Sequence, residues 1–286
     1  MKKKILITGS TGFIGSHIKE YLLKKNYLVI DILRKKNKKK IKKIYKNYKP
    51  IFYNNIYDLE KKIKKIQYNI IINCATFYSK NYDCKTVLEL IKTNILFSTL
   101  IIIGNQKNLK KIINFDTMMQ HSIDENFNPM NVYAITKFAH KNISKFIISK
   151  NKNIKFYNFK LYETFGLNDK RNKLIPSIIK NYKKNKFTNI VSNNLEMNFT
   201  DINNIIQIIE KILNKNLYTP KEYILKNYKS VNIRELINEC NQKLKKKIKV
   251  KYLSSKKINL IRIKNSRIQN INLKCNIKDF ILENIN

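Results

Sequence analysis

The sequence predicts an α/β fold in which a doubly wound parallel sheet is joined to a smaller C-terminal lobe. Short apolar runs typical of buried parallel strands alternate with segments whose apolar residues recur at helical spacing. A glycine-rich turn at residues 9–15 directly follows the first of these runs. Strands that alternate with helices form βαβ units, and their right-handed crossovers place helices on both faces of a parallel sheet.

The expected elements follow one another in a regular order. We expect strands at 4–8, 27–32, 51–53, 70–73, 111–115 and 154–160. We expect helices after the glycine turn and at 59–66, 86–103 and 131–149, and a basic loop at 34–49. The alternation weakens after residue 161, so we expect a main domain at 1–165. Residues 166–286 should then form mostly a separate lobe, with some elements returning to the main sheet.

The formal net charge of +40 is extreme, and by itself it suggests a nucleic-acid partner. The lysines, however, are spread along the whole chain, and the abundance of Lys, Asn, Ile and Tyr is typical of AT-rich codon usage. We therefore do not expect nucleic-acid binding. No apolar stretch looks long enough to cross a membrane, and no h-region follows the basic N-terminus, which favours a cytoplasmic protein. The four cysteines show no metal-ligand spacing, so we expect no metal site.

The glycine turn has the spacing G-x-x-G-x-x-G, formed by Gly9, Gly12 and Gly15. Between a strand and a helix, such glycines allow a tight turn and let the backbone approach a pyrophosphate. The helix N-terminus then offers free N–H groups to the phosphates. The sequence therefore predicts a dinucleotide site, with Thr11, Phe13 and Ile14 of the turn also in contact with the cofactor.

The end of the second strand contacts the adenosine ribose in such sites. An acidic residue there favours NAD, whereas an arginine accommodates the additional phosphate of NADP. Arg34 stands near the diagnostic position and slightly favours NADP, while Asp31, earlier in the strand, leaves NAD open.

Tyr133 and Lys137 are four residues apart and therefore share one face of the predicted helix. A nearby ammonium lowers the pKa of a phenol, so this pair is expected to exchange a proton with a sugar hydroxyl while hydride moves at a nicotinamide.

Together, the glycine turn and the Tyr133/Lys137 pair resemble the extended short-chain dehydrogenase/reductases, the NAD(P)-dependent epimerase/dehydratase family. This resemblance implies a Rossmann domain, with Thr117 as the catalytic hydroxyl and Asn94 as the helix asparagine that supports the lysine. It also implies that Asn55, Ile56 and Ala75 contact the cofactor and that Thr76 contacts the substrate.

The later segments resemble the parts of this family that hold the substrate. Glu163 follows the strand that leads into the lobe, and Met197 stands where an arginine is usual, which makes Arg171 and Lys173 the candidates for binding the diphosphate. The Asp-Thr pair that ends in Thr117, together with Glu163, most resembles CDP-sugar 4-keto reductases that make 3,6-dideoxyhexoses.

The resemblance implies an NAD(P)-dependent enzyme, expected to be a homodimer, that reduces or epimerises a nucleotide-diphosphate sugar by hydride transfer. A 4,6-dehydratase is one alternative, although Met118 and Met119 stand where dehydratases of the family carry an Asp-Glu pair. The other alternative is a non-catalytic regulatory or RNA-binding protein that keeps the fold and the cofactor.

Overall fold

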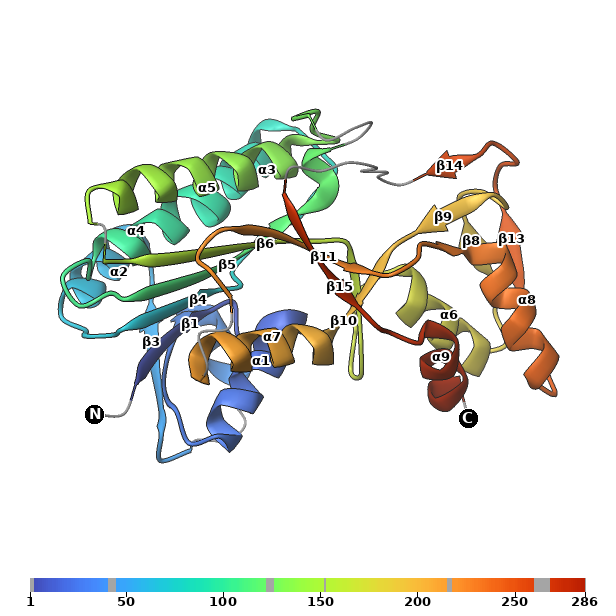
Figure 1. The fold of residues 1–286 in the computed structure, drawn as a ribbon, viewed down its shortest axis with the longest axis horizontal. Helices are drawn as coiled ribbons and strands as arrows, with labels where there is room; N and C mark the ends of the chain where they lie inside the picture. Colours follow the sequence, from blue (N-terminus) through green and yellow to red (C-terminus); the bar gives the residue numbers. More distant parts are fainter. Residues whose placement is uncertain are drawn as a thin grey trace.

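The computed structural model describes residues 3–40, 45–121, 126–151, 153–214, 218–259 and 268–285. Its centre is an eight-stranded sheet in the order β15-β11-β6-β5-β4-β1-β2-β3 (Figure 1). Every neighbouring pair of strands in this sheet is parallel. The predicted doubly wound α/β fold is therefore confirmed.

Six of the strands are those expected from the sequence. They are β1 (Lys4–Thr8), β2 (Leu28–Arg34), β3 (Tyr48–Tyr53), β4 (Ile70–Asn73), β5 (Lys111–Thr117) and β6 (Lys155–Leu161). The predicted loop at 34–49 is too long, because β2 continues to Arg34 and β3 already begins at Tyr48. A 3-10 helix, η1 (Lys35–Lys40), follows β2, and residues 41–44 of the predicted loop lie outside the described residues.

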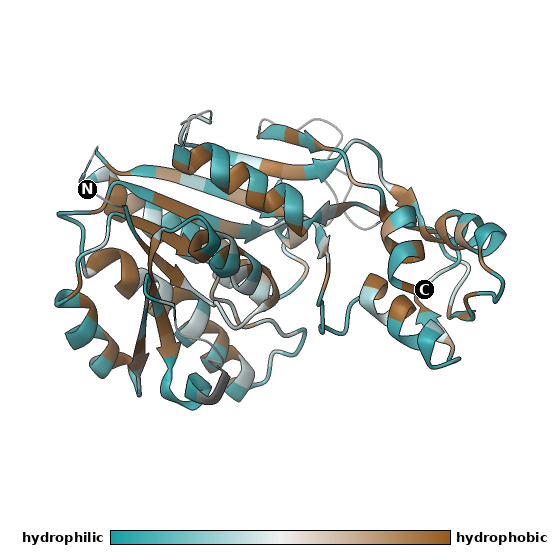
Figure 2. Cartoon of the chain, turned by 90° about the horizontal axis from the view of Figure 1, so that it is seen from below, coloured by the Kyte–Doolittle hydropathy of each residue, from teal (hydrophilic) through white to brown (hydrophobic). Residues whose placement is uncertain are grey.

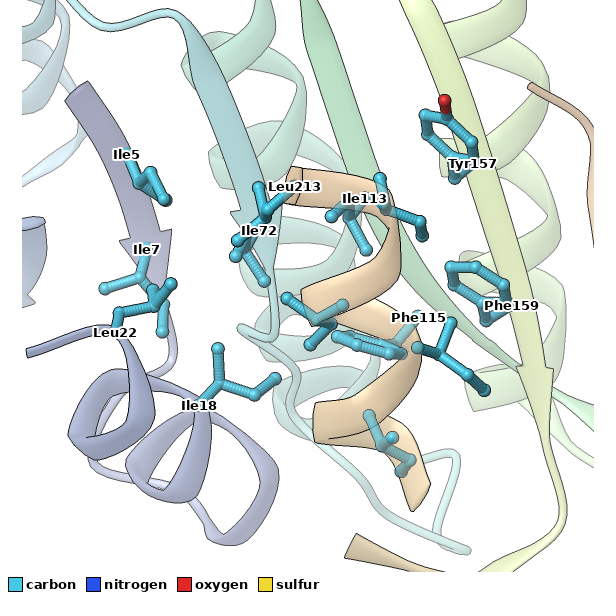
Figure 3. Close-up of a cluster of buried hydrophobic side chains, with 14 of the residues drawn as sticks. Ile5, Ile7, Ile18, Leu22, Ile72, Ile113, Phe115, Tyr157, Phe159 and Leu213 are labelled. Carbon is cyan, nitrogen blue, oxygen red and sulfur yellow. The ribbon is translucent and has the colours of Figure 1, made fainter. Parts of the chain in front are cut away.

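Helices cover both faces of the sheet (Figure 1). On one face lie α1 (Phe13–Lys24) and α7 (Ile202–Asn214). Figure 3 shows how Ile18 and Leu22 of α1 and Leu213 of α7 meet the sheet side chains, among them Ile72 and Phe115. The other face carries α2 (Ile56–Lys64), α3 (Cys84–Leu90), α4 (Ser98–Ile103) and α5 (Val132–Ser149). Burial of these apolar faces is the main force that assembles the layers.

The predicted helix at 86–103 is interrupted by a π-helical segment, η2 (Ile91–Phe97), between α3 and α4. The whole stretch Cys84–Ile103 is long and apolar enough to cross a membrane by length and composition, so the expectation that no such stretch exists is wrong. Its residues Leu90, Phe97, Ile101 and Ile102 are nevertheless buried. This helix covers one face of the sheet in the described structure.

The C-terminal lobe has a core of its own, seen beside the sheet domain in Figure 2. Its helices are α6 (Leu174–Lys183), α8 (Ile233–Lys243) and α9 (Ile277–Ile285). Its short strands are β7 (Glu163–Phe165), β8 (Thr188–Ile190), β9 (Leu195–Met197), β10 (Phe199–Asp201), β12 (Val231–Asn232), β13 (Val250–Tyr252) and β14 (Ile258–Asn259). Three elements of the C-terminal half belong to the main sheet domain instead, namely α7, β11 (Glu222–Asn227) and β15 (Gln269–Leu273). The domain limits at 165 and 166 stay predictions.

Candidate active site

Two cavities open at the carboxyl ends of the central strands, where parallel α/β sheets bind their ligands. The larger has a volume of about 520 Å³ and the smaller about 360 Å³. Ile14, Cys74, Thr76 and Arg171 line both, so the two cavities adjoin each other.

The glycine turn forms one wall of the smaller cavity. Gly9 has a φ of +67°, and a Cβ there would lie 2.6 Å from backbone atoms of Cys74 and Ala75. A Cβ on Gly15 would lie 2.3 Å from the carbonyl oxygen of Gly9. Gly12 is the N-cap of α1 and provides no side chain to cap it. The first N–H groups of α1 therefore remain available to an anion, and the turn fits a dinucleotide pyrophosphate.

The structure separates the two residues considered for ribose recognition. Arg34 lines the smaller cavity. Asp31 is fully buried within β2, where its carboxylate accepts hydrogen bonds from Ser10 Oγ at 2.5 Å and Tyr48 OH at 2.6 Å. Burial raises the pKa of Asp31 above its ordinary value. Among the described residues that line this cavity there is no carboxylate.

Thr11, Phe13, Ile14 and Ala75 also line the smaller cavity, as the resemblance implies. Asn55 and Ile56 are not among its lining residues, and the Asn55 side chain instead caps α2 by accepting from Asp58 N at 2.9 Å. Tyr53 was not predicted, but it lines the cavity from the end of β3 and stacks on Phe97 with 5.5 Å between the ring centroids.

Tyr133, Lys137 and Thr117 come together at the larger cavity. The cap residue Asn131 starts α5 by accepting from Ala134 N at 3.0 Å, which places Tyr133 in the first turn. Thr117 ends β5 beside them, and its hydroxyl accepts from Met119 N at 3.2 Å.

The charge state of the pair differs from the expectation. Burial raises the pKa of Tyr133 above its ordinary value, and a hydrogen bond with Thr76 opposes this only in part. Burial lowers the pKa of Lys137, and the charge of Asp116 opposes it. The expected lowering of the phenol pKa is therefore wrong, because loss of solvation is the largest influence on it. Tyr133 is held in its protonated form.

Asn94 does not lie on the cavity surface but stands behind it, inside the π-helical segment. Its amide donates to Phe77 O and to Thr136 Oγ1, both at 3.0 Å. Its oxygen accepts from Phe77 N at 2.8 Å and from Thr76 Oγ1 at 3.2 Å. Asn94 therefore ties the loop after β4 to α5, and π-helical turns are frequent at functional sites.

Methionines form much of the apolar wall of the larger cavity. Met118, Met119, Met130 and Met197 all line it. Tyr78 and Tyr162 also line it, and the ring of Tyr78 packs edge-on against Tyr133 at 5.0 Å. The sequence pattern did not single out Tyr78, which is far from Tyr133 in the chain, or Met130, which stands shortly before it.

The lobe contributes charged groups to the same cavity. Lys173 pairs with Glu163 at 3.2 Å, and its ammonium lies 5.1 Å from the Tyr78 ring centroid. The Arg171 guanidinium donates two hydrogen bonds to Asp169, at 2.8 and 2.7 Å. Its guanidinium lies 4.2 Å from the ring centroid of Phe13 in the glycine turn. Arg171 thus links the lobe to the cofactor turn. The described residues hold no His/Cys/Asp/Glu cluster suited to a metal ion.

This geometry agrees with the comparisons to known proteins. The model of the NAD dependent epimerase/dehydratase family matches residues 5–225. The chain belongs to this family. CDP-abequose synthase of Salmonella muenchen is 27% identical over 257 residues, covering 88% of this chain and 84% of that protein. The enzyme of the same name from Yersinia pseudotuberculosis is 24% identical, and the match covers 78% of this chain and 81% of that protein.

A solved structure supports the fold assignment. UDP-glucuronic acid 4-epimerase from Bacillus cereus, in complex with a fluorinated UDP-sugar and NAD, superposes with a TM-score of 0.77 at 18% identity. The match covers 99% of this chain and 98% of that one. At this identity, the match bears on the fold alone.

Proposed function

We propose that this family member is an NAD(P)-dependent reductase of a 4-keto nucleotide-diphosphate sugar. One observation carries the proposal. The cavity that brings Thr117, Tyr133 and Lys137 together has methionines at 118 and 119, where an elimination would need an acid and a base. Reduction of a ketone needs one proton donor, and Tyr133 supplies it.

In the proposed reaction, Thr117 donates a hydrogen bond to the ketone oxygen and orients the carbonyl. When bound, the reduced nicotinamide supplies hydride to the carbonyl carbon. Tyr133 donates its proton to the oxygen as the C=O double bond becomes C–O, which completes the alcohol. Loss of solvation keeps the phenol protonated, so that it can donate. Lys137 then stabilises the phenolate that remains.

The wall of the larger cavity supports a deoxygenated sugar as substrate. Beside polar residues such as Asn73, Thr76 and Asn198, much of its surface is formed by thioether and aromatic side chains. They pack well against methyl and methylene groups. Together with the similarity to CDP-abequose synthases, this favours a CDP-linked 4-keto-3,6-dideoxyhexose. Arg171 and Lys173 are the proposed partners of the diphosphate.

For the cofactor, we propose that NADP is preferred over NAD. Asp31 is engaged by Ser10 and Tyr48, whereas Arg34 lines the cavity at the end of β2. A guanidinium there would pair with the ribose phosphate of NADP.

We further propose that the protein is a cytoplasmic homodimer. Exposed apolar side chains lie on the paired helices of one sheet face, at Leu88, Ile91 and Leu96 on α3 and η2 and at Ile135 and Phe146 on α5. Surface of this kind marks a protein contact, and a second copy of the same face would cover it.

A direct assay tests the proposed function. The wild-type protein should oxidise one NADPH for each molecule of CDP-4-keto-3,6-dideoxyhexose it consumes. Tyr133→Phe should abolish this turnover and leave the Kd for NADPH unchanged. Tyr157→Phe, at a buried tyrosine of β6 outside both cavities, is the matched control and should turn over normally. Normal turnover by Tyr133→Phe would refute the proposed role of the phenol.

A further inference from the structure

Lys160 lies on β6 behind the active site, and only 1% of it is exposed. Its ammonium lies 2.8 Å from Gln120 Oε1, 2.6 Å from His121 Nε2 and 3.1 Å from Glu222 Oε1. All of these contacts are internal to the protein. A buried lysine is unfavourable unless it is paired, so a specific role has to account for it.

Two of the three partners belong to the turn that follows Thr117. Since an ammonium can only donate, His121 accepts at Nε2. Its Nδ1 lies 2.9 Å from Asn126 O, and a carbonyl can only accept, so Nδ1 carries the proton. His121 is therefore a neutral imidazole fixed at both nitrogens. Lys160 donates to its Nε2, and its Nδ1 donates to the backbone carbonyl of Asn126, in the segment that leads towards α5.

Gln120 extends these contacts to Thr117. Its oxygen accepts from Lys160, and its amide nitrogen donates to Asp116 Oδ1 at 2.6 Å. The same carboxylate oxygen accepts from Thr117 N at 2.8 Å. An unbroken chain of hydrogen bonds thus runs from Lys160 through Gln120 and Asp116 to the backbone of Thr117.

The turn is also tied to the segment before Tyr133. Asn128 N donates to Gln120 O and Met130 N donates to Met119 O, both at 2.9 Å. Whatever fixes Gln120 and His121 therefore fixes both sides of the larger cavity, with Thr117 on one side and the start of α5 on the other.

The third partner, Glu222, does not touch this turn in any described contact. It also pairs with Lys141 at 3.3 Å and with Lys145 at 3.6 Å. Removal of Lys160 would thus leave Glu222 with two cations, and the variant should still fold. A buried ion pair is weak evidence for stability, whereas a group held at fixed distances from a reactive hydroxyl can set its position.

We propose that Lys160 is a positioning residue, which holds the turn Met118–His121 and thereby places Thr117 for the reduction. It touches neither cavity. This inference rests on the proposed function.

The test compares Lys160→Met with Lys141→Met. Lys141 is the matched control because it is also buried, and it also bonds Glu222. Its other described contact is with the ring of Phe138. Displacing a reacting group by about 1 Å can lower a rate about 100-fold. We expect Lys160→Met to lower kcat about 10- to 100-fold with little change in the KM for the keto sugar, and Lys141→Met to leave kcat unchanged.

Two further measurements separate positioning from general stability. Amide hydrogen exchange at 118–121 and 128–130 should speed up in Lys160→Met and not in Lys141→Met, and this readout needs no substrate. Adding Lys160→Met to Thr117→Val should lower kcat little further, because both changes remove the same contribution. Gln120→Met, which breaks the link to Asp116 while Lys160 keeps Glu222, should reproduce the loss of kcat if Lys160→Met does not fold.

The inference is overturned by equal kcat values in Lys160→Met and Lys141→Met, by additive effects with Thr117→Val, or by unchanged exchange in the turn. Tyr133→Phe is measured in the same assay. Normal turnover by Tyr133→Phe overturns the proposed function. If Tyr133→Phe is inactive and the two lysine variants have equal kcat values, only the positioning role is overturned.

Discussion

Gly9 and Gly12 lie three residues apart in the cofactor turn, and their substitution by alanine should fail for different reasons. At Gly9 a methyl group would meet three backbone atoms at 2.6 Å, in a residue whose φ is +67°. The left-handed backbone costs a side chain about 1–2 kcal/mol, and overpacking against an immobile backbone adds about 1–3 kcal/mol. Gly9→Ala should therefore lose about 2–5 kcal/mol of a typical unfolding free energy of about 5–15 kcal/mol.

At Gly12 the same methyl group would meet a single atom, Gly9 O at 3.3 Å, and φ is an ordinary −88°. Alanine is a poorer N-cap than glycine, so the loss of stability should stay below about 1 kcal/mol. The methyl group would, however, stand where the backbone approaches the pyrophosphate. Gly12→Ala should fold but bind NADPH weakly.

Urea unfolding followed by circular dichroism gives the stabilities, and fluorescence titration gives the Kd for NADPH. The reasoning is refuted if Gly9→Ala is as stable as Gly12→Ala, or if Gly12→Ala binds NADPH as the wild type does.

Three more predictions concern charge and assembly. Arg34→Ala should raise the KM for NADPH about 10-fold, the lower end of the range for a hydrogen bond to a charged group, and leave the KM for NADH unchanged; equal changes for both cofactors would contradict the assignment. Burial alone would raise the pKa of Glu222, but Lys160, Lys141 and Lys145 together hold it below the ordinary 4.5. Glu222 thus contributes stability above that pH, and this stability is lost as the pH falls through the lowered pKa. The urea midpoint of Glu222→Gln should therefore fall less steeply below pH 4.5 than that of the wild type. Ile135→Asp combined with Phe146→Asp should convert a dimer into a monomer in sedimentation experiments, and a wild-type monomer would refute the dimer.

The sequence predicted those parts of the fold that depend on local pattern. Apolar runs and the glycine turn identified six strands and the N-terminus of α1. The strands β11 and β15 escaped prediction because their pairing with β6 and with each other is decided by contacts far along the chain.

The same limit applies to the site. Thr117, Tyr133 and Lys137 could be named from spacing and resemblance, and the structure brings them to one cavity. Asp31 left NAD open because only its place in the chain was known, whereas Ser10 and Tyr48 decide where its carboxylate points. The role of burial in the pKa of Tyr133 could not be read from the i and i+4 spacing.

Transfer of deuterium from cofactor to sugar tests the central claim most directly. The protein is incubated with NADPH deuterated at the nicotinamide C4 and with CDP-4-keto-3,6-dideoxyhexose, and the product is analysed by mass spectrometry and NMR. Our account predicts one deuterium at C4 of the sugar, with one cofactor oxidised for each product formed. A product without deuterium, or one formed with no net oxidation of the cofactor, would contradict it.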